Sequence, residues 1–106
     1  MTEHGASDVV RNDDAHRFEL AIEGDAIAAA YYRLDAKGRL VLTHTEVPSQ
    51  YEGRGFASAL ARGLFEIARS RRLTLVLKCP FLRSWYARHP EYREVVDESR
   101  GSFAEI

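Results

Sequence analysis

The chain has 106 residues, which is enough for one small domain and too few for two domains that each build a hydrophobic core. Hydrophobic residues make up 45% of it and charged residues 29%, a balance that is typical of a globular fold and too apolar for a disordered chain. The 15 basic and 16 acidic residues give a net charge of -1, which argues against general binding to nucleic acid or to anionic membranes.

The single cysteine, Cys79, excludes an internal disulfide framework and any zinc site that needs two thiolates. No apolar run approaches the ~20 residues needed to span a bilayer. The first residues of the sequence lack the basic and apolar regions of a signal peptide. We therefore expect a cytoplasmic protein, a monomer or weak dimer, with no metal centre, no nucleic-acid partner and no membrane contact.

The first predicted strand follows a polar stretch, residues 1–15, which has no hydrophobic period and is expected to be a flexible tail. Apolar and polar residues alternate over residues 16–22, as they do in a strand. Two further runs, residues 26–34 and 39–47, follow short segments of turn-forming residues. The first half is thus predicted to be an antiparallel meander of three strands.

The second half changes to a helical period. Apolar residues recur every three or four positions over residues 55–70, which predicts a helix. The apolar run that follows predicts a buried strand over residues 73–79. Strand, helix and strand in this order predict a right-handed crossover between parallel strands. Pro80 ends the second strand, and a short helix follows until Pro90.

Together these elements predict one compact α/β domain over residues 16–96: an antiparallel meander, a parallel strand-helix-strand crossover and a short helix. Residues 97–106 are mostly polar and are expected to form a C-terminal tail.

The most informative segment joins the third strand to the long helix. Gly53 and Gly55 stand one residue apart just before this helix, so the backbone there can approach a ligand closely. The amides and the dipole at the start of the helix would make a site for phosphate oxygens, and Arg54 adds a positive charge. The alternative is a tight turn that needs glycine for conformational reasons alone.

This loop resembles the pyrophosphate loop of the GNAT superfamily of acetyl-CoA-dependent N-acetyltransferases, which reads Gln/Arg-x-x-Gly-x-Gly/Ala. Residues 52–57, Glu-Gly-Arg-Gly-Phe-Ala, match it at the Gly and Ala positions, and Ser-Ala-Leu continues the usual start of the helix. Glu52 replaces the usual Gln or Arg, a departure that changes a side chain and leaves the backbone amides as they are.

The chain is more closely similar to a short subgroup of stand-alone GNAT domains. The shared motifs are His-Thr-Glu-Val-Pro at residues 44–48, Cys-Pro-Phe at 79–81 and His-Pro-Glu-Tyr at 89–92, within a resemblance that covers residues 16–93. It implies a GNAT-like fold, acetyl-CoA as cosubstrate, and an amine acceptor, either a small molecule or a protein lysine or N-terminus. Larger members place two helices between their first strands, where this chain has only residues 23–25.

The third strand carries two candidates for the catalytic base. Regular alternation would place Leu40, Leu42, His44 and Glu46 on one face, with the polar pair beside the glycine loop. His44 or Glu46 could then accept the proton of the amine, directly or through water. Alternatively, His44 caps the edge of the core and Glu46 binds backbone or an arginine. A bulge in this strand, common in the superfamily, would change the alternation.

Two further candidates follow the second parallel strand. Cys79 ends that strand just before a helix, a position that favours a thiolate, and the alternative is a buried, inert thiol. In the subgroup this cysteine is proposed to lie beside the acyl thioester, as a nucleophile or as a neighbour. Tyr86 stands where the superfamily has a tyrosine that protonates the departing coenzyme A thiolate, although an aromatic at helical spacing is also typical of core.

From these residues we predict transfer of acetyl from acetyl-CoA to an amine. The alternatives are a non-catalytic acyl-CoA-binding or partner-docking module, and a structural domain without ligand. The catalytic candidates are Cys79, His44, Glu46 and Tyr86. The candidates for cofactor binding are Val47, Gly53, Arg54, Gly55, Phe56, Ala57, Ser58, Cys79, Pro80, Phe81 and Tyr86.

Overall fold

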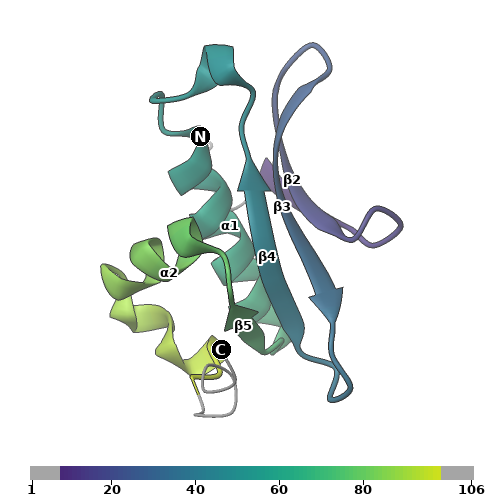
Figure 1. Cartoon of the computed structure of the whole chain (residues 1–106), viewed down its shortest axis with the longest axis vertical. Coiled ribbons are helices and arrows are strands. Elements are labelled where there is room, and N and C mark those ends of the chain that lie inside the picture. The colour runs from purple at the N-terminus through teal and green to yellow at the C-terminus, as the bar shows by residue number, and fades with distance from the viewer. Residues whose placement is uncertain (1–7, 99–106) are drawn as a thin grey trace.

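The computed structural model describes residues 8–98, which form a five-stranded mixed sheet with helices (Figure 1). The strands lie in the sheet in their chain order. The elements are β1 (Val9–Asn12), β2 (Arg17–Glu23), β3 (Ala26–Leu34), β4 (Leu40–Glu46), η2 (Ser49–Tyr51), α1 (Phe56–Arg71), β5 (Leu75–Leu77), α2 (Pro80–Ala87) and η3 (Pro90–Val95).

The predicted α/β architecture is confirmed: β1 to β4 pair antiparallel, and β4 and β5, joined through α1, pair parallel. One strand was missed, because β1 lies within residues 1–15, the expected tail. β1 has only four residues and its two valines are adjacent, so its sequence lacks the repeated alternation of apolar and polar residues that predicted β2. Residues 1–7 of that tail and residues 99–106 of the C-terminal one lie outside the described residues.

The helices form a layer on one face of the sheet. α1 contacts β1, β2 and β3 because its apolar side chains share one face, with Leu60 and Leu64 fully buried. α2 and η3 pack against α1 through aromatic rings: the ring centroid of Phe65 lies 5.1 Å from that of Trp85 and 5.3 Å from that of Tyr92. Cavities lie at the end of β4.

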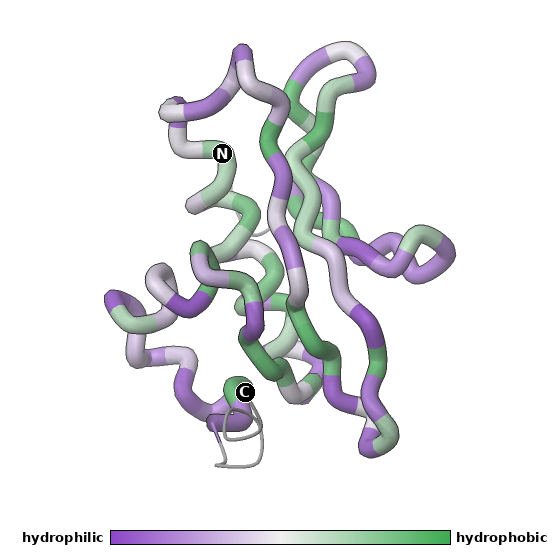
Figure 2. The backbone as a smooth tube through the Cα atoms, viewed as in Figure 1, coloured by the Kyte–Doolittle hydropathy of each residue, from purple (hydrophilic) through white to green (hydrophobic). Residues whose placement is uncertain are grey.

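β4 contains a bulge at Thr43. Tyr31 of β3 pairs with His44, whereas the adjacent Tyr32 pairs with Leu42, so Thr43 is an extra residue in β4. Figure 2 shows that β4 also changes along its length, from hydrophobic in its first residues to more hydrophilic in its later ones.

The bulge reverses the alternation that the sequence predicted. Thr45 pairs with Ala30, which is fully buried in the core, so Thr45 lies on the core face of the sheet. His44 and Glu46 lie on the opposite face. The expectation that Leu40, Leu42, His44 and Glu46 share one face is therefore wrong, because one inserted residue moves every later side chain to the other side.

A wedge opens between β4 and the chain that follows β5. The two strands pair only over residues 40–42 of β4. The carbonyl oxygen of Leu42 accepts hydrogen bonds from the N–H groups of Lys78 and Cys79, both at 3.0 Å, which closes the ladder. Beyond this point β4 continues, whereas the chain after β5 turns into α2 (Figure 1).

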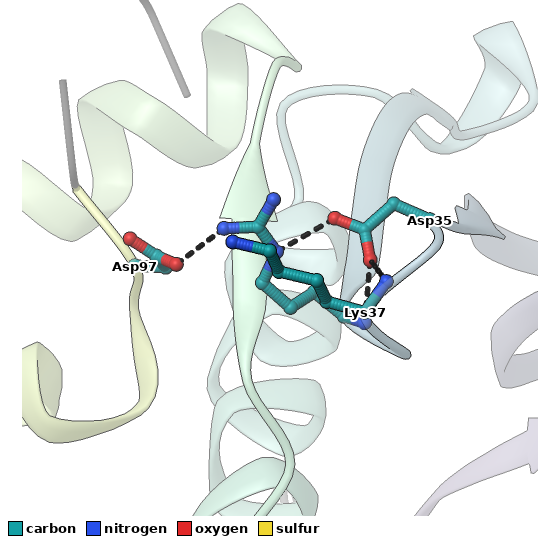
Figure 3. Close-up of polar contacts among 4 residues, drawn as sticks. Asp35, Lys37 and Asp97 are labelled. Carbon is teal, nitrogen blue, oxygen red and sulfur yellow. Dashed lines mark hydrogen bonds and ion pairs between the residues drawn. The ribbon is translucent and has the colours of Figure 1, made fainter. Parts of the chain in front are cut away.

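A cluster of charges holds the opposite end of β4. The guanidinium of Arg39 lies 2.6 Å from the carboxylate of Asp35 and 2.5 Å from that of Asp97 (Figure 3). The N–H groups of Lys37 and Arg39 both donate to Asp35 at 2.9 Å. The N–H of Asp97 donates to the carbonyl of Leu75 at 2.8 Å. The β3–β4 turn is thus tied to the chain beyond η3.

Within residues 8–98, no helix combines the length and apolar character needed to cross a bilayer. The same residues contain no group of three histidine, cysteine, aspartate or glutamate side chains placed to hold a metal ion.

Candidate functional site

The glycine loop ends in an open helix N-terminus. Gly55 is the N-cap of α1. Within residues 8–98 no side chain caps the helix there, and its first turn has no acidic residue. The N–H of Ala59 donates to the carbonyl of Gly55 at 3.0 Å, which is the first turn of the helical ladder. The N–H groups of residues 56–58 therefore have no acceptor within the helix, and they lie at the positive end of its dipole.

Both glycines are required by the backbone. Gly53 has φ 77° and Gly55 has φ 88°, a left-handed region that side-chain-bearing residues rarely adopt. A Cβ at Gly55 would meet no atom of the described residues within 4 Å, so these residues leave the space beside the loop open to a ligand. The turn therefore needs glycine at both positions for conformational reasons, and the binding of phosphate oxygens by its amides stays a prediction.

A pocket of about 360 Å³, here called the loop pocket, lies between this loop, the end of β4 and the start of α2. Most of the residues expected to bind cofactor line it: Val47, Gly53, Gly55, Phe56, Ala57, Ser58 and Phe81. Three residues that were not predicted line it as well: Thr45, Tyr51 and Glu52. The structure thus brings the glycine loop and Phe81 to one place, whereas Cys79 and Pro80, also expected to bind cofactor, do not line this pocket.

Tyr51 anchors the loop to the sheet. Its side chain is buried, and its hydroxyl donates to the carboxylate of Glu23 at 2.5 Å, a hydrogen bond that together with burial raises the pKa of Tyr51. The guanidinium of Arg54 lies over the rings of Tyr51 and Phe56, 5.5 and 5.9 Å from their centroids. The positive charge of Arg54 therefore stays beside the loop without lining the pocket.

Cys79 lies at the inner end of the wedge. Only 3% of it is exposed, and its Sγ is 3.7 Å from Oγ1 of Thr45. It is the N-cap of α2, which begins at Pro80. Thr45 was missed although it belongs to the His-Thr-Glu-Val-Pro run, because a regular strand would have put it on the other face. Only the bulge brings it to Cys79.

His44 and Glu46 meet on the far face of the sheet. Nε2 of His44 lies 3.1 Å from Oε2 of Glu46, and their side chains are 59% and 61% exposed. They line a second depression of about 560 Å³, here called the outer cleft. Thr45, Val47 and Glu52 line both the outer cleft and the loop pocket, so the two cavities adjoin at the end of β4.

Tyr86 occupies a different place. Its hydroxyl donates to the carboxylate of Glu98 at 2.5 Å, and burial together with this hydrogen bond raises the pKa of Tyr86 to about 12. It lines a third depression, of about 360 Å³, beside Leu77 and Val96. None of the described residues that line this depression lines the loop pocket, so the structure does not bring Tyr86 together with the glycine loop.

A protein-family model described as GCN5-related N-acetyl-transferase matches residues 17–95, which is the chain from β2 to the end of η3. The match includes the glycine loop, both parallel strands and Cys79. It confirms the resemblance that the sequence motifs indicated, and it supports acetyltransferase activity in general.

Proposed function

The chain belongs to the GCN5-related N-acetyltransferase family, and on that basis we propose that it transfers the acetyl group of acetyl-CoA to the nitrogen of an amine. The observation that carries the proposal is the loop pocket, where the open N-terminus of α1 adjoins apolar side chains of Val47 and Phe81. Helix N–H groups suit the pyrophosphate, and the wedge suits the pantetheine arm.

The residues present fit acetyl-CoA in three respects. The space at Gly55 is open, the first turn of α1 carries no carboxylate, and the guanidinium of Arg54 lies beside the loop. Among the described residues that line the loop pocket, Glu52 is the single carboxylate. It is exposed, so solvent and salt screen its repulsion of phosphate. We propose that residues 53–58 hold the phosphates, and that Val47, Cys79, Pro80 and Phe81 contact the arm.

The cosubstrate supplies an acetyl thioester, and the protein must stabilise the oxygen of its carbonyl as that oxygen becomes negative. Among the described residues, β4 has no partner strand on its β5 side after Leu42. An N–H group of this free edge can donate to the developing oxyanion, an interaction that often supplies much of the catalysis in acyl transfer.

His44 and Glu46 are proposed to remove the proton of the amine. An ammonium must lose a proton before its nitrogen can attack. With Nε2 of His44 beside the carboxylate of Glu46, Nδ1 can accept that proton while Glu46 orients the ring and stabilises its charged form. The amine nitrogen then forms a C–N bond with the acetyl carbon, the C–S bond breaks, and the thiolate takes up a proton.

Direct transfer to the amine is favoured over an acetyl-Cys79 intermediate. Cys79 is almost fully buried and lies beside the hydroxyl of Thr45, an arrangement that suits packing beside the thioester better than attack on it. Tyr86 could protonate the leaving thiolate only after its hydroxyl leaves Glu98.

A module that binds acyl-CoA without turnover is the second candidate. One observation favours it: β2 and β3 are joined by a tight turn at Gly24 and Asp25, where larger family members place helices that shape the acceptor site.

One experiment separates the two candidates. The protein is melted with and without acetyl-CoA and then assayed for thiol release with a panel of amines. Saturation at about ten times the dissociation constant adds roughly 1.4 kcal/mol of stability, which corresponds to a rise of ~4–8 °C for a domain of this size. A thermal shift with thiol release that requires an amine supports the transferase. A shift without release with any amine supports the module.

A further inference from the structure

The outer cleft has the shape and charge of a site for a cationic amine. We propose, resting on the transferase function above, that the acceptor is an alkylamine with a second positive charge, bound in the outer cleft between Tyr31, Glu46 and Glu52. This assigns a substrate class to a surface that the family match leaves undefined.

Residues paired across the strands form the floor of the cleft. Tyr31 of β3 pairs with His44 of β4, and their rings are stacked with centroids 6.0 Å apart. In the next row, Ala29 lies between its partners Glu19 and Glu46. Because alanine is so much shorter than its neighbours, this row leaves a hollow beside the rings. Such a hollow suits the carbon chain of an alkylamine. The ring of Tyr31 itself already has the guanidinium of Arg17 5.7 Å from its centroid, so the carboxylates of the cleft must attract the cationic head.

The charges at the cleft favour a cation. Arg17 also lines it, but its Nε lies 2.6 Å from the carboxylate of Glu19, which compensates its charge. Glu46 and Glu52 line the cleft as well, and the partner of Glu46 is His44, which is charged only when protonated. Among its described lining residues, the cleft therefore presents two carboxylates against one guanidinium that Glu19 already neutralises.

The position of the cleft fits an acceptor site. It adjoins the loop pocket through Thr45, Val47 and Glu52, so an amine bound in it lies close to a thioester held in the wedge. Glu46, bound to the proposed base His44, would attract the charged amine into the cleft. Glu52, at the border of the two cavities, would hold the second charge.

Three amines of equal chain length test the charge preference. At neutral pH, 1,4-diaminobutane carries two positive charges, butylamine carries one, and 4-aminobutanoate carries one positive and one negative charge. We expect kcat/KM to fall in that order by about two- to fivefold at each step, since each step removes or reverses one contact with an exposed carboxylate. The preference for the diamine should weaken as salt is added.

A lysine side chain next to another basic residue carries the same pair of positive charges as the diamine. Peptides in which lysine is followed by arginine or by aspartate, assayed beside the diamine, distinguish the two sources. A higher kcat/KM for the diamine than for the Lys-Arg peptide identifies a small molecule as the better acceptor, and the reverse identifies a protein. Preference for the Lys-Asp peptide over the Lys-Arg peptide contradicts the proposal.

A matched pair of variants tests the location. Glu52→Gln removes one carboxylate from the cleft and should shrink the preference for diamine over butylamine by about two- to fivefold. Glu91→Gln makes the same change at an exposed residue of η3, outside the cleft, and should leave that ratio unchanged. A general loss of structure would lower both rates together, so the ratio reports on charge at the cleft.

The outcomes separate this inference from the function on which it rests. If butylamine or 4-aminobutanoate is acetylated with a kcat/KM equal to that of the diamine, the cationic site is wrong and the transferase stands. If no amine is acetylated, the transferase proposal fails. Changes in the amide chemical shifts of Ala29 and Tyr31 on titration with 1,4-diaminobutane then test whether the outer cleft binds a diamine. Shifts that weaken in Glu52→Gln support the cleft as a cation site, and an absence of shifts overturns it.

Discussion

The two ends of β4 are built in opposite ways. At the first end, Arg39 binds Asp35 and Asp97, and residues 40–42 pair with β5. At the other end, after the bulge at Thr43, the strand has no partner on its β5 side among the described residues, and both cavities open there. Backbone groups can stay unpaired at the open end because the closed end holds the parallel pair together. The contacts that stabilise the fold and the proposed ligand site thus lie at opposite ends of one strand.

The largest effect on binding is expected from Gly55→Glu at the open end. It should abolish acetyl-CoA binding, as measured by calorimetry, because it adds bulk and negative charge where a phosphate is expected. Gly38→Glu at the closed end is the matched control. Gly38 has φ 80° and Gly55 has φ 88°, and a Cβ at either position would meet no atom of the described residues within 4 Å. The control should bind normally. Normal binding by Gly55→Glu would mean that the loop does not hold the phosphates.

A smaller effect, on turnover, is expected from Cys79→Ser. Direct transfer predicts a loss of about tenfold or less, because size and polarity change little, whereas a nucleophilic cysteine predicts a loss of orders of magnitude. Mass spectrometry of the protein mixed with acetyl-CoA alone provides the second measurement. An acetyl group on Cys79 that passes to an added amine at the turnover rate would establish the covalent route in place of direct transfer.

Arg39→Met should weaken only the closed end of β4. Loss of the contacts to Asp35 and Asp97 should lower the melting temperature by a few degrees. The affinity for acetyl-CoA, measured well below the melting transition, should stay unchanged, because Arg39 lies at the other end of β4. A loss of affinity as large as that in Gly55→Glu would show that the two ends are not independent.

The smallest effect is a pH dependence at Asp35. Burial alone would raise the pKa of this carboxyl, but hydrogen bonds from Arg39 and from the N–H of Lys37 outweigh it and lower the pKa below its usual 3.8. A lowered folded-state pKa adds stability that is present above about pH 4 and lost as the pH falls through the folded value. Asp35→Asn should therefore lower the melting temperature near neutral pH, and the difference from wild type should shrink below pH 4. A difference that is constant with pH would contradict this.

The strands and the long helix whose residues show a regular hydrophobic period could be predicted from the sequence. The second predicted run, residues 26–34, coincides with β3, and the predicted helix 55–70 differs from α1 by one residue at each end. The glycine loop was predictable because the need for positive φ limits the choice of residue at Gly53 and Gly55.

The faces of β4 depend on long-range pairing and could not be predicted in the same way. Whether Thr43 is an extra residue is decided by how Tyr31 and Tyr32 pair across the sheet, about ten residues away in the chain. A regular period placed His44 with the core and Thr45 away from it, and the bulge reversed both. The hydrogen bond of Tyr86 to Glu98 likewise joins residues that are 12 positions apart, and it produces no periodic pattern in the sequence.

The most direct test of the account is a map of amide chemical shifts as acetyl-CoA is added to the wild-type protein. The account predicts the largest changes at Gly53, Gly55 and Phe56, with further changes at Cys79 in the wedge and none at Gly38 in the closed end. Changes that cluster around Gly38, or no change at millimolar acetyl-CoA, would contradict the claim that the open end of β4 is the cosubstrate site.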